Sequence, residues 1–241
     1  SIEQAKIITD TYKRNENKPR IIQRALALKA AMEQLEIRVE PEELIVGNRT
    51  AGVRYGVVFP ESGSTWVDRE FETLPTRPQD KFLVREEDIA YFRDIIKPYW
   101  EGKSLEDVLR QRYGKEIDKI DKVVKINQKD HAQGHICPDC AMWLKKGPSQ
   151  LMTDADDRAR LSSGSKRDFY QSVSIVMQGA KNFMERYSRL LIETAGKEPG
   201  QANKDNMIKV ARICHKLSEQ PPETFHEAIQ SLWFLFVILH M

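Results

Sequence analysis

The sequence lacks the features that mark secreted and membrane-spanning proteins. It holds only three cysteines, an odd number that is too small for a disulfide framework, and its polar first segment has no apolar signal region. No stretch of about 18 uncharged apolar residues occurs, so we expect no membrane-spanning helix. These absences predict a protein of the reducing cytoplasm.

An excess of charge of one sign is also missing. The 38 Lys and Arg residues nearly balance the 36 Asp and Glu residues, and the formal net charge is +2. Without a basic block there is no electrostatic basis for binding nucleic acid or a membrane surface. The apolar fraction of 40% is sufficient for a folded core in one large domain or two small ones.

The spacing of apolar residues predicts a mainly helical chain with little sheet. Helix-like spacing covers 3–15, 19–36, 86–97, 104–113, 167–194, 203–216 and 223–241, with a short helix ending near Lys146. Between these we expect a strand-like patch at 43–46, an ordered irregular segment at 49–82, a solvated connection at 114–130 and a loop at 153–166. The last helix has no Gly, Asn or Pro stop, so we expect a longer polypeptide to continue beyond Met241.

Cys137 and Cys140 form a C-x-x-C pair. A thioredoxin-like role requires a βαβ pattern around the pair, and the sequence has none. Structural zinc requires a second pair of ligands, which Cys214 and the histidines do not supply. We therefore expect ordinary thiols, with a small zinc or redox module as the alternative.

The long helix predicted over 167–194 has an apolar stripe that consists of Phe169, Val173, Val176, Ala180, Phe183, Tyr187 and Leu190. A polar sector lies opposite this stripe and consists of Arg167, Gln171, Ser174 and Gln178. A solvent-exposed face is the plain interpretation. After Arg167, however, the sector holds amides and a hydroxyl instead of Lys and Glu. Because Arg167 and Gln171 are one turn apart, the pair can hold one small anion.

His135 is a second candidate binding residue. It follows Gly134, where the backbone can approach a ligand closely, and a neutral imidazole can donate to or accept from a substrate hydroxyl. The alternative is a structural histidine bonded to Asp139.

Eight short motifs follow one another along the chain. They are RALALK (24–29), EELIVGN (42–48), VFPE (58–61), TRPQDKF (76–82), PYW with a following Gly-Lys (98–103), GHICPD (134–139), KRDFYQ (166–171) and FHEAIQSLWF (225–234). With them the chain resembles the N-terminal part of the glycyl radical enzymes related to pyruvate formate-lyase, especially the isethionate sulfite-lyases.

The resemblance implies that residues 1–241 are the mainly helical N-terminal part of a ten-stranded α/β barrel of the pyruvate formate-lyase type. The family's Gly-Cys-x-Glu and Arg-Val-x-Gly-Tyr motifs are absent from the chain. The catalytic cysteine loop and the glycyl radical domain are therefore expected outside it, and none of its cysteines is assigned as the radical cysteine.

The resemblance also implies a protein-derived glycyl radical with no metal, a radical-SAM activating enzyme as partner, anaerobic chemistry, a small-molecule substrate and a homodimer. Arg167 and Gln171 match the pair that isethionate sulfite-lyases use for a sulfonate. His135 matches a substrate-contacting histidine of glycerol-dehydratase-like enzymes.

The resulting functional hypothesis is a glycyl radical lyase that cleaves the C–S bond of a small hydroxyalkyl sulfonate, converting isethionate to acetaldehyde and sulfite. One alternative is a glycyl radical dehydratase of glycerol, propanediol or a related polyol. Another, of a different class, is a non-catalytic helical binding or scaffold fragment.

Overall fold

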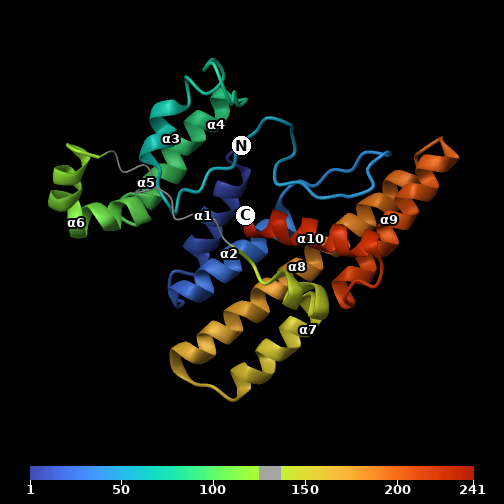
Figure 1. Cartoon of the computed structure of the whole chain (residues 1–241). Coiled ribbons are helices and arrows are strands. Elements are labelled where there is room, and N and C mark those ends of the chain that lie inside the picture. Colours follow the sequence, from blue (N-terminus) through green and yellow to red (C-terminus); the bar gives the residue numbers. More distant parts are fainter. Residues whose placement is uncertain (125–136) are drawn as a thin grey trace. The chain divides into compact units, whose positions relative to one another are not determined.

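The computed structural model describes residues 1–124 and 137–241, and all regular structure within those ranges is helical (Figure 1). The elements are α1 (Glu3–Arg14), α2 (Arg20–Gln34), α3 (Thr65–Glu70), α4 (Glu86–Tyr91), the π-helical η1 (Phe92–Ile96), α5 (Lys97–Trp100), α6 (Leu105–Asp121), α7 (Cys140–Arg160), α8 (Gly164–Ala195), α9 (Gln201–Glu219) and α10 (Phe225–Leu239). None of these helices combines the length and apolar character needed to span a bilayer.

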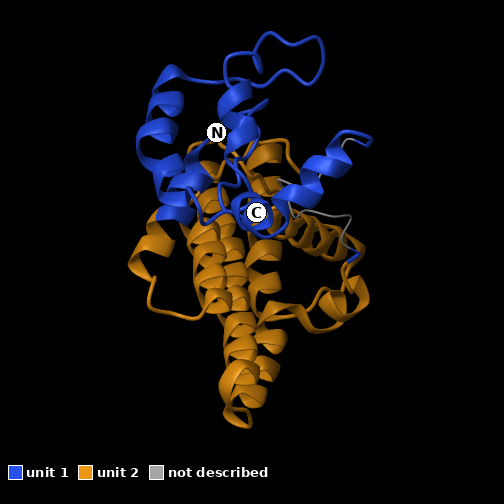
Figure 2. Ribbon diagram, turned by 90° about the vertical axis from the view of Figure 1, so that its left-hand side faces the viewer, with its two compact units in different colours: residues 1–9, 52–137 blue, residues 10–51, 138–241 orange. Residues whose placement is uncertain are grey.

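The chain divides into two compact units (Figure 2). Unit 1 comprises residues 1–9 and 52–137, and unit 2 comprises residues 10–51 and 138–241. In unit 1, the rings of Phe71 and Phe92 pack edge to face with centroids 5.1 Å apart. The buried Trp100 donates from its indole N–H to the Thr9 hydroxyl at 2.9 Å, which ties the end of α5 to α1.

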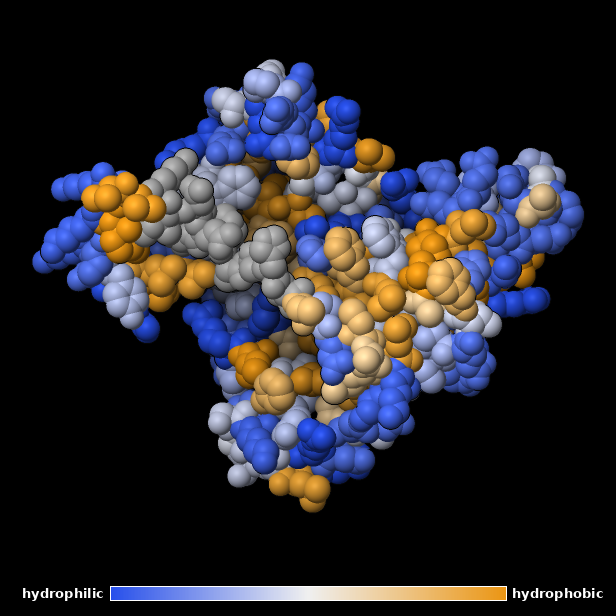
Figure 3. Space-filling view, in the orientation of Figure 1, coloured by the Kyte–Doolittle hydropathy of each residue, from blue (hydrophilic) through white to orange (hydrophobic). Residues whose placement is uncertain are grey.

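Unit 2 is built around the long helix α8, which packs against α2, α7 and α9. Its core joins α8 to α10 through the fully buried rings of Phe183, Tyr187 and Phe234. The opposite side of α10 remains exposed and apolar, and Figure 3 shows hydrophobic surface over this helix. The exposed residues are Phe225, Ile229, Trp233 and Phe236.

Most predicted helices are confirmed, and several boundaries are corrected. The helix expected over 86–97 runs through Trp100 as α4, η1 and α5. The helix expected to end at 113 continues as α6 to Asp121 after a kink at Tyr113, so the solvated connection was wrong for 114–121.

Two further predictions about secondary structure were wrong. The strand-like patch at 43–46 forms no strand, because side chains of α10 satisfy its backbone. The loop expected at 153–166 is helical except at its centre, since α7 continues to Arg160 and α8 begins at Gly164. Ala155 and Ala159 are buried there, and two alanines among charged residues give only a weak apolar pattern.

The apolar stripe predicted for the long helix is correct only in its second half. Ala180, Phe183 and Tyr187 are fully buried. Phe169, in contrast, is 51% exposed, and the helix also buries small residues that the pattern did not select, including Ser172 and Gly179. A helix with several neighbours buries more than one face, so a single stripe describes it incompletely.

Candidate functional site

The hairpin formed by α7 and α8 positions the predicted anion-binding pair. The Asp139 side chain begins α7 by accepting from the Met142 backbone N–H at 2.8 Å. Gly147, with φ of 64°, and the following Pro148 kink the helix. After α7 ends, residues 161–163 connect directly to α8, so the two helices lie antiparallel with their tip at this connection.

Packing near the connection holds the two helices together. Ala155 and Ala159 of α7 are buried at one-turn spacing, and their small side chains allow a close approach. The Arg158 guanidinium lies over the ring of Tyr170 on α8, 5.8 Å from its centroid. The start of α8 is therefore fixed against the end of α7.

An open hollow of about 460 Å³ lies at the tip of the hairpin. It is lined by Asp156, Ala159 and Arg160 of α7, Ser162 of the connection, and Arg167 and Gln171 of α8. The structure thus brings Arg167 and Gln171 to one hollow and adds three polar residues of α7 and the connection to them. The role of the pair in substrate binding stays a prediction.

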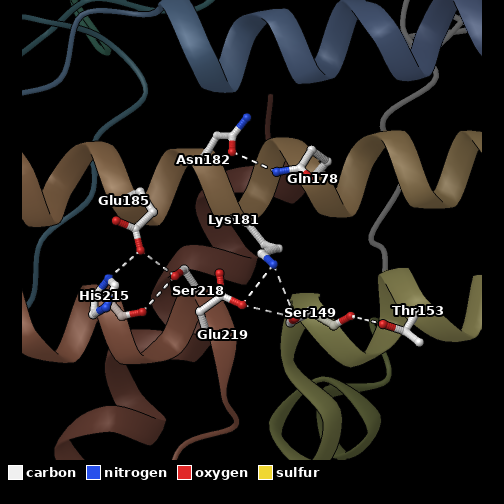
Figure 4. A network of polar contacts seen from close by, with 9 residues as sticks. All are labelled: Ser149, Thr153, Gln178, Lys181, Asn182, Glu185, His215, Ser218 and Glu219. Atoms are coloured by element: carbon white, nitrogen blue, oxygen red, sulfur yellow. Dashed lines mark hydrogen bonds and ion pairs between the residues drawn. The ribbon is translucent and has the colours of Figure 1, made fainter.

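The rest of the predicted polar sector does not share this hollow. Ser174 is not among the lining residues. The Gln178 amide donates to Asn182 at 2.9 Å, as Figure 4 shows. Asn182 in turn donates to Glu33 of α2 at 2.5 Å. The second half of the sector therefore joins helices to one another.

The charges around the hollow favour an anion. Within the part of the chain that the structure describes, no ion pair or side-chain hydrogen bond engages the exposed Arg167. The first turn of α8 has no acidic residue, and the N-terminus of a helix carries partial positive charge. Arg160 adds a second guanidinium, although it also pairs with Asp157 at 2.9 Å.

The other predicted residues lie elsewhere or remain outside the described ranges. His135 falls outside the described residues, so its role stays a prediction. Cys137 and Cys140 are exposed, whereas Cys214 is buried and burial raises the pKa of its thiol. Among residues 1–124 and 137–241, no group of three His, Cys, Asp or Glu side chains is arranged to hold a metal ion.

Sequence reasoning missed a polar network between α8 and α9 (Figure 4). The Glu185 carboxylate accepts from the Ser218 hydroxyl at 2.6 Å and lies 2.6 Å from Nδ1 of His215. One turn away on α8, Lys181 donates to Glu219 at 3.0 Å. The one-turn spacing of Lys181 and Glu185 was a signal in the sequence, although it does not identify partners on another helix.

This network does not form a hydrolase triad. The Ser218 hydroxyl donates to the Glu185 carboxylate and the His215 backbone carbonyl, not to the imidazole ring. In a hydrolase triad the imidazole lies between the serine and the carboxylate, whereas here the Glu185 carboxylate lies between Ser218 and His215. The arrangement therefore joins α8 to α9 and supports the hairpin that carries the hollow.

Comparison with known proteins identifies the class of protein to which this fold belongs. The family model described as "Pyruvate formate lyase-like" matches residues 1–241. Probable dehydratase YbiW of Escherichia coli is 28% identical and is matched over 99% of this chain. Isethionate sulfite-lyase of Oleidesulfovibrio alaskensis is 28% identical over 97% of the chain, and (2S)-3-sulfopropanediol dehydratase of Klebsiella oxytoca is 27% identical over 100%.

Solved structures agree with this class. The B12-independent glycerol dehydratase from Clostridium butyricum has a TM-score of 0.92 at 29% identity, covering 98% of this chain and 31% of its own. A glycyl radical enzyme from Archaeoglobus fulgidus has a TM-score of 0.93 at 29% identity, covering 100% of this chain and 32% of its own. The fold is thus that of one part of a glycyl radical enzyme.

The chain belongs to the pyruvate formate lyase-like family, as the sequence motifs predicted. It spans only 30% of YbiW, 31% of the sulfopropanediol dehydratase and 30% of the isethionate sulfite-lyase.

Proposed function

We propose that this chain is the N-terminal, substrate-anchoring part of a glycyl radical lyase that cleaves the C–S bond of a small hydroxyalkyl sulfonate, with isethionate as the first candidate. The observation that carries the proposal is the pair Arg167 and Gln171, which line one hollow at the positive end of α8. Two of the relatives are named for sulfonates, and this supports the same substrate class here.

The chemistry of a sulfonate suits this pair. A sulfonate is a compact, permanent anion with three acceptor oxygens. The planar guanidinium of Arg167 can donate two parallel hydrogen bonds to it, and the Gln171 amide adds another donor. A cationic substrate such as choline would be repelled by the same arginine.

The reaction requires no external oxidant or reductant, because isethionate divides into acetaldehyde and hydrogen sulfite with all atoms balanced. The protein-derived radical, carried by residues outside this chain and generated by a radical-SAM activating enzyme, supplies hydrogen-atom abstraction next to the hydroxyl. Arg167 and Gln171 hold the sulfonate in one orientation, which fixes the position of the carbon that reacts.

A glycyl radical dehydratase is the second candidate. The similarity to a glycerol dehydratase and to a sulfopropanediol dehydratase favours it, because these proteins are named for loss of water. The two candidates differ in the bond that breaks, C–S or C–O. They also differ in their need for Arg167 when the substrate is an uncharged polyol.

The test is turnover by the full-length protein, activated anaerobically. With isethionate we expect sulfite and acetaldehyde in equal amounts. Arg167→Ala should raise KM for isethionate by roughly 10- to 100-fold, because a charge-assisted bidentate contact is lost. Arg167→Lys should restore part of the affinity. Lys166→Ala is the matched control, since this exposed neighbour does not line the hollow.

Each alternative gives a different result. An activated enzyme that releases no sulfite from any short sulfonate rejects the lyase. Dehydration of glycerol or propanediol that Arg167→Ala leaves unchanged identifies a polyol dehydratase. Failure to form a radical with any activating enzyme, as judged by electron paramagnetic resonance, favours the non-catalytic scaffold.

A further inference from the structure

Asp156 is the one lining residue of the hollow whose charge opposes anion binding. It is half-buried on α7, and Arg167 lines the same hollow from α8. A carboxylate placed there lowers the affinity of the hollow for any simple anion. Anion binding alone therefore does not explain why a carboxylate lines the hollow.

Neither arginine of the hollow neutralises this carboxylate. Arg160 lies one turn after Asp156, a favourable spacing for an ion pair, but its guanidinium contacts Asp157 instead. Arg167 also forms no pair with Asp156 within the described residues. Opposite charges thus line one hollow without contact, and the space between them is open to a ligand.

A carboxylate is an acceptor only, so the group that it binds must be a donor. A ligand that spans the hollow therefore needs an anionic end for Arg167 and Gln171 and a donor end for Asp156. An ammonium group meets the second condition best, because it adds charge attraction to its hydrogen bonds, and a hydroxyl meets it less strongly.

We propose that the hollow is a dipolar site in which Asp156 binds a hydroxyl or ammonium group on the same small molecule whose sulfonate is held by Arg167 and Gln171. This inference rests on the proposed function and narrows its substrate class. The site selects short sulfonates that carry a hydrogen-bond donor and disfavours those that lack one. A 2-aminoalkyl sulfonate becomes a competitive ligand of the site.

The opposing interpretation is that Asp156 only offsets the positive charge of the two arginines. In that case, removing its charge strengthens the binding of every sulfonate of net charge −1 by the same factor. The two interpretations therefore differ in the ratio of the affinities for 2-hydroxyethanesulfonate and ethanesulfonate, because these two ligands carry the same net charge.

The experiment is calorimetric binding to the full-length protein before activation, so no turnover is needed. The three probes are 2-aminoethanesulfonate, 2-hydroxyethanesulfonate and ethanesulfonate, which share one anionic end. We expect affinity to fall in that order. Asp156→Asn should lower the affinity ratio of the hydroxy compound to ethanesulfonate, two ligands of equal charge, by roughly three- to tenfold.

Two variants serve as controls. Asp157→Asn removes the neighbouring carboxylate, which does not line the hollow, and should leave the ratio unchanged. Asp156→Glu keeps the charge and should retain part of the preference. Circular dichroism on each variant checks that the helices are intact.

The outcomes separate the two proposals. An unchanged ratio of the hydroxy compound to ethanesulfonate in Asp156→Asn, which includes equal strengthening of these two ligands, overturns the dipolar site. If Arg167→Ala weakens the binding of all three in that case, the sulfonate site itself stands. If none of the three binds the wild-type protein, the dipolar site and the sulfonate site both fail.

Discussion

The side-chain amide of Gln230 bonds both backbone groups of Val46. It accepts from the Val46 N–H at 2.8 Å and donates to the Val46 carbonyl at 2.8 Å. Gln230 is fully buried on α10, and Val46 is fully buried in the extended segment beside it. A side chain thus provides the pair of hydrogen bonds that a neighbouring strand would otherwise supply.

Replacing Gln230 with Leu should therefore destabilise unit 2 strongly. Both Val46 backbone groups lose their partner in a buried place, and we expect the free energy of unfolding to fall by about 2–5 kcal/mol. Urea denaturation measures the loss, and hydrogen exchange at the Val46 amide locates it. Gln201→Leu, at an exposed position on α9, is the control and should change stability little. Wild-type protection of the Val46 amide in Gln230→Leu would contradict the argument.

The same contact explains why the strand prediction at 43–46 was wrong. The segment Glu43-Leu44-Ile45-Val46 has the composition of a strand, and its backbone does need partners. Those partners are side chains of helices: His226 of α10 contacts the Leu44 carbonyl at 2.7 Å, and Asn206 of α9 donates to the Glu43 carbonyl at 3.0 Å. Local pattern indicates an extended backbone, but it does not indicate which distant group satisfies it.

The candidate site was likewise predictable in part: its residues on one helix were found from the sequence, and its residues on the neighbouring helix were not. Periodicity on one helix placed Arg167 and Gln171 on the same side, and the structure brings both to the hollow. Asp156 and Arg160 come from a segment that was expected to be a loop. Their place at the hollow depends on the antiparallel packing of α7 on α8, which pairs residues that no helical spacing relates.

The close packing of α2 on α8 leads us to predict that a larger side chain at Gly179 lowers stability. A Cβ at this position would lie 2.4 Å from Met32 Cε and 3.0 Å from the Cα of Lys29. The Met32 methyl group can move, whereas the α2 backbone cannot move without repacking. We expect Gly179→Ala to lower the free energy of unfolding by about 1–3 kcal/mol, despite the better helix propensity of alanine.

Gly114 on α6 provides the matched comparison for Gly179. A Cβ there would meet nothing within 4 Å. Gly114→Ala should therefore raise stability by about 0.5–1 kcal/mol through helix propensity alone. Thermal denaturation of both variants gives the comparison, and a stabilised Gly179→Ala would show that the contact between α2 and α8 is loose.

The beginning of α10 predicts an acid-sensitive contribution to stability. Burial of the Glu227 carboxylate opposes its ionisation. The backbone N–H groups of Glu223 at 2.7 Å and Thr224 at 3.1 Å, together with the Lys216 ammonium at 2.9 Å, outweigh burial and lower its pKa below the ordinary 4.5. A carboxyl group with a lowered folded-state pKa stabilises the fold above pH 4.5, and this contribution disappears as pH falls through the lowered value.

Glu227→Gln should therefore be less stable than the wild type at pH 7, and the difference should shrink as the pH falls below 4.5. Urea denaturation at a series of pH values measures this difference. Glu223→Gln is the control, because it removes a more exposed carboxylate that contacts the same Lys216. A difference between Glu227→Gln and the wild type that stays constant with pH would exclude the ionised carboxylate as its source.

Substitution of Gly164, at the connection between α7 and α8, is expected to change both the stability of the fold and the binding of the sulfonate. This residue opens α8 with φ of 56°, and a Cβ there would meet nothing within 4 Å. Alanine at this position is therefore penalised by backbone strain alone, by about 1 kcal/mol, and asparagine, which tolerates left-handed φ better, is penalised less. Stability should fall in the order Gly, Asn, Ala, and denaturation measures it.

Because Arg167 lies in the first turn of α8, relief of this strain moves its guanidinium. KM for the sulfonate should then rise in the same order as stability falls, with a small effect on kcat if the pair only binds substrate. Ser165→Ala, at the adjacent exposed position, should leave both quantities unchanged. If Gly164→Ala loses stability and KM stays at the wild-type value, the strain at Gly164 is absorbed without moving Arg167, and the proposed link between the two is excluded.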